Sequence, residues 1–127
     1  MPSRRGLILV VDDQAGVRRL IQEVFREVGY RVLTATNGQE ALAAAAAYAP
    51  SAVILDMKMP IMDGLETLRV LKAAQPKLLV VMMTAVGDGD QINEALSSGA
   101  HSCVSKPFDV FALRKLVTDV LDKEGKA

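Results

Sequence analysis

Five short runs of strand-forming residues, separated by longer segments with helical spacing, constrain the fold of this 127-residue chain most. The runs cover residues 7–11, 30–35, 52–55, 78–83 and 102–105. Most are apolar at nearly every position rather than at every second one, which is typical of a parallel sheet covered on both faces. The sequence therefore predicts strands that alternate with helices on the two faces of one sheet.

The segments between the runs predict helices. In the first, apolar residues recur at helical spacing and Gly29 provides a stop signal. The residues that recur at this spacing are Val17, Leu20, Ile21, Val24, Phe25 and Val28. Asn37-Gly38 would suit a hairpin, but GQEALAAAAAYA follows and has a helical pattern, so a strand-to-helix loop is expected.

Three further helices complete the pattern. One opens at Asp63-Gly64 and ends before Pro76. Another covers about 90–98, places Ile92, Ala95 and Leu96 on one face, and stops at Gly99. The last covers about 109–122. Its expected inner face consists of Val110, Leu113, Val117, Val120 and Leu121. Five strands and five helices predict an open, doubly wound α/β domain, whose ligand site lies beyond the carboxyl ends of the strands.

Composition describes one ordinary globular domain over residues 1–127. Fifteen basic and fifteen acidic residues cancel, so no electrostatic preference for nucleic acid or a membrane surface is expected. A single cysteine, Cys103, excludes an internal disulfide and a cysteine-based zinc site. The apolar stretch after the first residues is too short for a secretory signal or a membrane span, so a cytoplasmic location without membrane insertion is expected.

Polar residues follow four of the predicted strands. Asp12-Asp13 follow the first strand, Asp56 the third, Thr84 the fourth and Lys106 the fifth. Each alone has a plain structural explanation: Asp13 as a helix N-cap, Asp56 as a turn residue, Thr84 and Lys106 as solvated strand ends. Together they place three carboxylates, a hydroxyl and an ammonium group at one edge of the sheet.

Three clustered carboxylates repel one another and need a counter-charge. Magnesium suits such a site, because Mg²⁺ prefers oxygen ligands and is usually held by one or two carboxylates and a phosphate. An aspartate can also act as a nucleophile and form an aspartyl phosphate. The residues therefore favour a site for Mg²⁺ and one phosphoryl group.

Four motifs identify a resemblance. VVDD at 10–13, LDMKMPIMDG at 55–64, MTA at 83–85 and SKPF at 105–108 resemble the receiver domain of two-component response regulators. The resemblance covers about residues 6–122. It implies a flavodoxin-like fold with a five-stranded parallel sheet in the order 2-1-3-4-5. The same strand order is known for a chemotaxis protein of this family.

The resemblance also implies the role of each site residue. Asp56 would accept a phosphoryl group from a phosphohistidine on a partner, either a histidine kinase or a histidine phosphotransfer protein. It implies that Mg²⁺ is bound by Asp12, Asp13, Asp56 and the Lys58 carbonyl oxygen. It also implies that Lys106 and Thr84 contact the phosphoryl oxygens, and that the Lys106-Pro107 peptide bond is cis. Such a domain catalyses its own phosphorylation and dephosphorylation and is not a metabolic enzyme.

Several finer expectations follow from the same resemblance. The motif segments most resemble those of stand-alone receivers of the sporulation phosphorelay. This resemblance implies that the protein has no output domain and passes the signal by onward phosphotransfer or by protein contacts. It also implies a monomer or weak dimer. Cys103 stands where many receivers carry an aromatic switch residue, and a small buried thiol cannot make that movement. Lys58 and Val86, two residues after Asp56 and Thr84, are expected to affect the lifetime of the phosphorylated form.

Three other classes of protein compete with this interpretation. The first is a receiver-like interaction module that is not phosphorylated, which the intact set of site residues disfavours. The second is a phosphatase of the haloacid dehalogenase kind, in which a second acid stands where this chain has Lys58. The third is a nucleotide or flavin carrier, which would need a phosphate-binding loop after the first strand.

Overall fold

A computed structural model describes residues 6–85 and 87–124 of the chain. Five parallel strands form one sheet in the order β2-β1-β3-β4-β5, as the resemblance implies. The strands are β1 (Leu7–Val11), β2 (Arg31–Ala35), β3 (Ala52–Asp56), β4 (Leu79–Thr84) and β5 (Ser102–Ser105). The predicted doubly wound architecture is confirmed.

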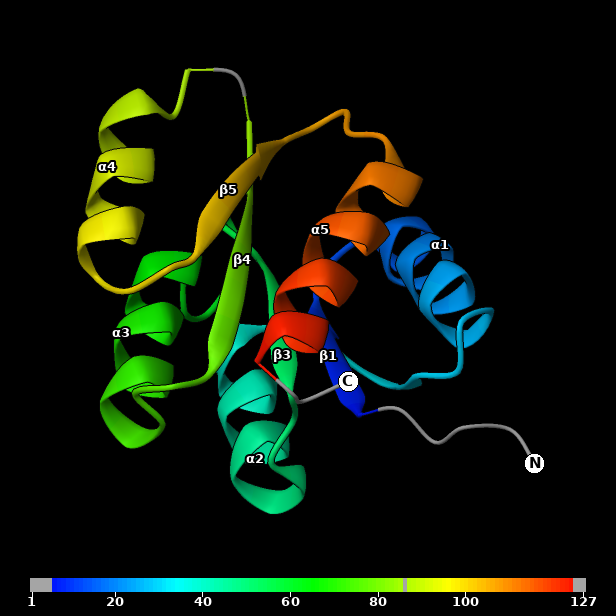
Figure 1. Cartoon of the computed structure of the whole chain (residues 1–127). Helices are drawn as coiled ribbons and strands as arrows, with labels where there is room; N and C mark the ends of the chain where they lie inside the picture. The colour runs from blue at the N-terminus through cyan, green and yellow to red at the C-terminus, as the bar shows by residue number, and fades with distance from the viewer. Residues whose placement is uncertain (1–5, 86, 125–127) are drawn as a thin grey trace.

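The strand register aligns the carboxyl ends of the strands. Val11 of β1 pairs with Leu55 of β3. On the other side of β3, Asp56 pairs with Met83. Residues that immediately follow these strands therefore emerge at one edge of the sheet. In Figure 1 this edge lies at the top, where the chain leaves β4 and β5.

The helices divide into two layers. They are α1 (Ala15–Arg26), α2 (Gly38–Tyr48), α3 (Gly64–Ala74), α4 (Gly89–Ser97) and α5 (Val110–Lys123). Helices α1 and α5 pack together on one face of the sheet, and α2, α3 and α4 cover the other (Figure 1). Among the described residues, no helix is long and apolar enough to cross a membrane.

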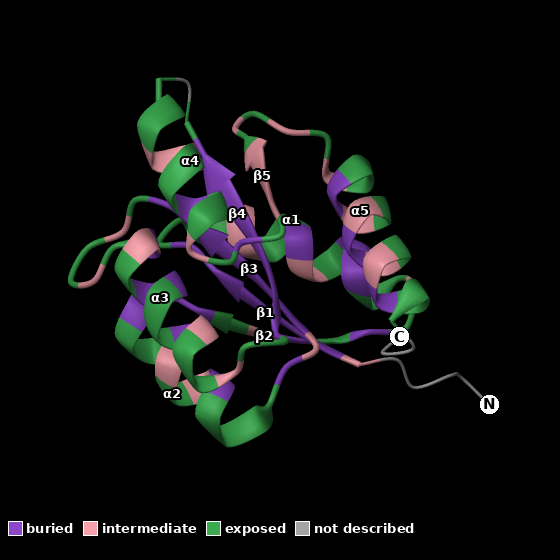
Figure 2. Ribbon diagram, turned by 60° about the vertical axis from the view of Figure 1, so that its left-hand side comes forward, coloured by how far each residue is buried: buried purple, intermediate pink, exposed green. Residues whose placement is uncertain are grey.

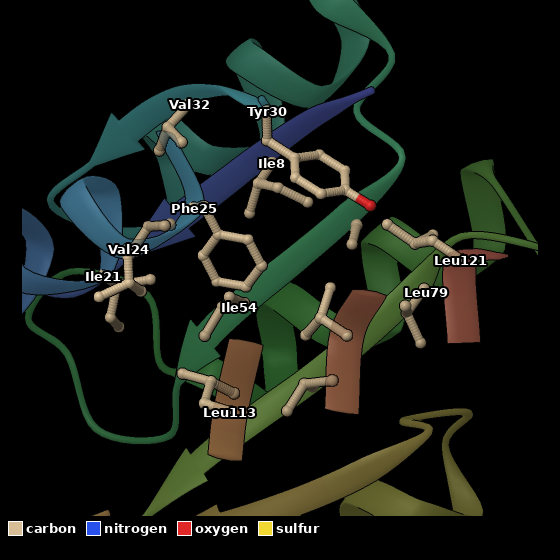
Figure 3. Close-up of a cluster of buried hydrophobic side chains, with 14 of the residues drawn as sticks. Ile8, Ile21, Val24, Phe25, Tyr30, Val32, Ile54, Leu79, Leu113 and Leu121 are labelled. Atoms are coloured by element: carbon tan, nitrogen blue, oxygen red, sulfur yellow. The ribbon is translucent and has the colours of Figure 1, made fainter. Parts of the chain in front are cut away.

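The sheet separates two apolar cores. One lies under α1 and α5 and includes Phe25 and Tyr30, whose rings meet edge to face with centroids 5.9 Å apart (Figure 3). The other lies under α2, α3 and α4 and includes Leu68 and Met82. The central strands β1, β3 and β4 are buried along their whole length, whereas the edge strands β2 and β5 are partly exposed. The helices are exposed on their outer sides (Figure 2). The nearly continuous apolar strands of the sequence follow from this arrangement.

Local capping fixes where three of the helices begin. Asn37 Oδ1 accepts a hydrogen bond from Glu40 N at 2.9 Å, and Asp63 Oδ1 accepts one from Glu66 N at 2.9 Å. Asp109 Oδ1 accepts from Phe111 N at 2.8 Å. Each cap satisfies a backbone donor that the helix itself leaves free. Asn37-Gly38 is thus a strand-to-helix connection, as expected, and not a hairpin.

Two apolar residues of the predicted helical patterns are exposed. Leu20 of α1 is 48% exposed and Leu96 of α4 is 45% exposed, so the buried face of each helix is narrower than its apolar pattern. In α4, Ala95 alone is classed as buried. In α4 the cause is local, because this helix packs against α3 and against β5, a short edge strand whose residues are partly buried or exposed. Helical spacing indicates an apolar side but not its width.

Candidate functional site

The carboxyl edge of the sheet holds a cavity of about 280 Å³. Its walls come from the segments after β1, β3, β4 and β5, and include Asp13, Asp56, Lys58, Thr84, Asp88 and Lys106. Hollows of about 490 and 510 Å³ lie around Lys77 and Leu78, which precede β4 at the opposite edge. Another, of about 400 Å³, lies beside Val17, Pro107 and Phe108. We place the chemistry in the smaller cavity, because it gathers the carboxylates and the lysine.

Three carboxylates come together at this edge. One oxygen each of Asp12, Asp13 and Asp56 lies within 4.8 Å of the others. Asp12 and Asp56 are buried and Asp13 is exposed, so a ligand can approach from the Asp13 side. The donor set consists of hard oxygens at close spacing, which fits a divalent cation such as Mg²⁺.

Lys106 provides the positive charge inside the cluster. Its Nζ lies 2.7 Å from Asp12 Oδ2 and 3.5 Å from Asp56 Oδ1. Its backbone N–H donates to the Thr84 carbonyl oxygen at 2.7 Å. The Lys106-Pro107 bond is cis, as the resemblance implied. The lysine thus bridges the carboxylates of β1 and β3 from the far side of β4.

The cluster shifts the pKa values of both partners. Burial, and then the charge of Asp12, raise the pKa of Asp56 to about 6, although Lys106 and the backbone amide of Lys58 oppose the rise. Burial by itself would lower the pKa of Lys106, but its hydrogen bond to Asp12 and the charges of Asp56 and Asp12 outweigh this and raise it. Asp56 is consequently ionised at neutral pH, and Lys106 stays protonated.

Thr84 is buried beside Asp56 but its hydroxyl is directed toward the edge strand. Thr84 Oγ1 donates to the carbonyl oxygen of Val104 at 3.3 Å. The side chain is 1% exposed. The hydroxyl therefore connects the cavity to β5 and would have to change partner to reach a group bound on Asp56.

Asp13 is not the N-cap of α1. The helix begins after Gln14, whose side chain makes no capping bond. The Gln14 backbone N–H donates instead to Asp12 Oδ1 at 2.8 Å. Asp12 is therefore held in place by this amide and by Lys106, which leaves Asp13 free of the capping role and directed to the cavity.

The loop after Asp56 is packed tightly beneath the site. Gly64 N–H donates to the Met57 carbonyl oxygen at 2.8 Å. A Cβ added at Gly64 would collide with the Asp56 carbonyl oxygen and would lie 2.7 Å from Met57 Cα. The Asp63-Gly64 pair thus both caps α3 and lets the helix start directly against the strand that carries Asp56.

Two residues at the cavity were judged differently by sequence. Asp88, in the loop after β4, is 6% exposed and lines the cavity, but sequence reasoning did not single it out. Lys58 was singled out, and its Nζ lies 3.4 Å from Asp88 Oδ1. The signal for Asp88 was its place four residues after Thr84. Val86, predicted to act with Lys58, lies outside the described residues.

Cys103 occupies β5 three residues before Lys106. It is partly buried and packs against the core beneath α2, α3 and α4. Burial raises the pKa of its thiol, which keeps the group neutral. Cys103 is a small strand residue, as predicted, but it is partly rather than fully buried.

An α/β domain with this strand order, and with an acidic cluster and a lysine at the carboxyl edge, has the chemotaxis-receiver-like architecture of flavodoxin-like proteins. The chain belongs to the response regulator receiver domain family, whose model matches residues 8–118. Family membership was thus correctly predicted from the four motifs.

Individual relatives agree with this assignment. The chain is 43% identical over 114 residues to sporulation initiation phosphotransferase F of Bacillus subtilis, covering 90% of this chain and 92% of that protein. It is 38% identical over 107 residues to the DNA-binding transcriptional regulator NtrC of Salmonella typhimurium, covering 84% of this chain but only 23% of NtrC. Among solved structures, the receiver domain of NtrX from Brucella abortus is 33% identical, with a TM-score of 0.85 and coverage of 91% and 98%.

Proposed function

We propose that this receiver domain accepts a phosphoryl group from a phosphohistidine onto Asp56, and passes the signal on by protein contacts or by transfer to another histidine. The observation that carries the proposal is the buried Asp56 carboxylate, held beside Asp12 and 3.5 Å from the ammonium group of Lys106. This arrangement provides an ionised nucleophile with a positive charge in reach of incoming phosphoryl oxygens.

The transfer follows from the groups at the site. An Asp56 carboxylate oxygen attacks the phosphorus atom, the P–N bond of the donor breaks, and the imidazole nitrogen keeps the electron pair. Lys106 then shares its charge between Asp12 and the phosphoryl oxygens, and Thr84 exchanges its bond with Val104 for one to a phosphoryl oxygen. Because phosphoryl transfer depends mainly on positioning and charge neutralisation, these groups account for most of what is required.

Magnesium completes the proposed site. Asp13 and Asp56 would hold the ion directly, with the Lys58 carbonyl oxygen, while Asp12 assists from its position beside Lys106. The bound ion supplies two positive charges that offset the carboxylates and the phosphoryl group. The close spacing of the three carboxylates supports this assignment.

Onward transfer in a phosphorelay is proposed on the strength of one relative. The Bacillus subtilis protein is named a sporulation initiation phosphotransferase, and it matches this chain over nearly its whole length. The expected partners are a histidine kinase and a histidine phosphotransfer protein, and the domain itself is proposed to act as a monomer or weak dimer.

A transfer assay tests this proposal. A phosphorylated histidine phosphotransfer domain is mixed with the wild-type chain, and with Asp56→Asn and Asp119→Asn variants. Asp119 is an exposed residue of α5 that pairs with Lys115 and does not line the site cavity, so it serves as the matched control. Label should move to the wild type and to Asp119→Asn in Mg²⁺, but not to Asp56→Asn or in excess chelator. Equal labelling of Asp56→Asn would contradict the proposal.

A further inference from the structure

The connection between β4 and α4 holds a buried carboxylate, Asp88, to which the transfer chemistry above assigns no role. Asp88 Oδ2 accepts a hydrogen bond from the Ala85 backbone N–H at 2.8 Å. Its other oxygen, Oδ1, lies 3.4 Å from Lys58 Nζ. One side chain thus joins the loop after β4 to the loop after β3.

Asp88 makes these contacts inside the cavity that holds Asp56. Lys58, Ala85 and Asp88 all line it. A phosphoryl group on Asp56 would bring roughly two negative charges into the same space. It would need the donors that Asp88 now occupies, because a buried anion is stable only when it is paired and hydrogen-bonded. The carboxylate and the phosphoryl group therefore compete for Lys58 and for the Ala85 N–H.

The first turn of α4 is weakly secured by other contacts. Asp88 is the N-cap residue, but its side chain makes no capping bond to the helix, since both oxygens are directed to Ala85 and Lys58. Gln91 Oε1 is buried without a hydrogen-bond partner among the described residues. A buried unsatisfied oxygen destabilises the arrangement that contains it. Losing the contacts of Asp88 would therefore free this end of α4.

We propose that Asp88 is a positioning residue that secures the β4–α4 connection in the unphosphorylated protein and is displaced when a phosphoryl group on Asp56 takes over Lys58 and the Ala85 N–H. This inference rests on the proposed function of Asp56. It gives phosphorylation a route to the α4 surface that needs no aromatic side chain at position 103. The moving parts are a carboxylate and one helix turn.

Binding of beryllium fluoride, an analogue of a phosphoryl group on a carboxylate, tests the competition. Affinity in Mg²⁺ is measured for the wild type, Asp88→Ala, Asp88→Asn and Asp90→Asn. Asp88→Asn keeps an acceptor for Ala85 and loses only the charge. Asp90 is an exposed acid in the first turn of the same helix, so Asp90→Asn is the matched control.

We expect Asp88→Ala to bind the analogue about tenfold more tightly, since loss of one hydrogen bond to a charged group corresponds to about 1.4 kcal/mol. Asp88→Asn should gain about threefold, and Asp90→Asn should resemble the wild type. In a Lys58→Met background, Asp88→Asn should add little, because there is no ammonium group left to compete for. Merely structural damage would weaken binding, so the sign of the effect separates the two explanations.

Hydrogen exchange tests the contact without any phosphoryl group. In the unphosphorylated protein, the Ala85 amide should exchange faster in Asp88→Ala than in the wild type, and Asp88→Asn should remain close to the wild type. If both Asp88 variants bind the analogue no more tightly than the wild type, the inference about Asp88 is overturned. The proposed function of Asp56 is still supported in that case, provided that the wild type binds the analogue. A wild-type chain that binds no analogue and takes up no phosphoryl group would instead refute the proposed function. An Ala85 amide that exchanges at the same rate in Asp88→Ala and in the wild type would refute the contact between Asp88 and Ala85.

Discussion

Replacing Asp56 by asparagine should stabilise the metal-free protein at neutral pH. The pKa of Asp56 is raised from 3.8 to about 6 in the folded state. A raised carboxyl pKa means that the folded state holds the proton more tightly than the unfolded state. Stability is therefore lost as the pH rises from about 4 to about 6, and above that range the full cost of the ionised Asp56 is present.

The size of the effect follows from this shift. About two pKa units correspond to an upper limit of about 3 kcal/mol, at 1.36 kcal/mol for each unit. Asp13 and part of Lys106 are open to solvent, and screening at this crevice reduces the figure to roughly 1–2 kcal/mol. The asparagine side chain carries no charge at any pH, so the variant should exceed the wild type in stability by this amount at pH 7.5.

Urea unfolding followed by circular dichroism measures the difference. The two proteins are compared in chelator at pH 4.5 and 7.5, so that all other carboxyl groups contribute equally to both. The advantage of Asp56→Asn should shrink at pH 4.5. Mg²⁺ at ten times its dissociation constant should add about 1.4 kcal/mol to the wild type and much less to the variant. An Asp56→Asn protein that is less stable than the wild type at pH 7.5 would refute this reasoning.

Four further substitutions test other parts of the molecule. Lys106→Met should cost about 2 kcal/mol at neutral pH in urea unfolding, because it leaves buried Asp12 without its ammonium partner; no loss would show that the pair is not a stabilising contact. Gly64→Ala should destabilise by at least about 2 kcal/mol through its collision with the strand, whereas Gly16→Ala, with nothing within 4 Å, should stabilise α1 by about 0.5–1 kcal/mol. Lys58→Met should change the dephosphorylation rate, measured by loss of the labelled adduct, and an unchanged rate would exclude a role for that side chain.

The positions of the strand ends could be predicted because the apolar pattern of the sequence follows directly from the burial of a parallel sheet. In a parallel sheet covered on both faces, apolar runs mark the strands, and the first polar residue after each run marks the common edge. Asp56 and Thr84 close their strands as predicted, and Asp12 and Lys106 follow directly after theirs. The pattern was therefore sufficient to predict that Asp12, Asp56, Thr84 and Lys106 lie at one edge of the sheet.

The remaining features depend on contacts that no local pattern records. Asp88 and Lys58 are 30 residues apart, and their contact depends on how two loops fold over the sheet edge. The exposure of Leu20 and Leu96 depends on how closely a neighbouring element approaches each helix. Asp13 could not be distinguished from an N-cap, because an acidic pair before a helix allows either residue to take that role.

The most direct test of the central claim is the covalent state of Asp56. The chain is incubated with acetyl phosphate and Mg²⁺, its intact mass is measured, and the adduct is located by peptide mapping. The wild type should gain the mass of one phosphoryl group, carried on the peptide with Asp56, and Asp56→Asn should gain none. A wild type without an adduct, or an equal adduct on Asp56→Asn, would contradict the claim that Asp56 is the phosphoryl acceptor.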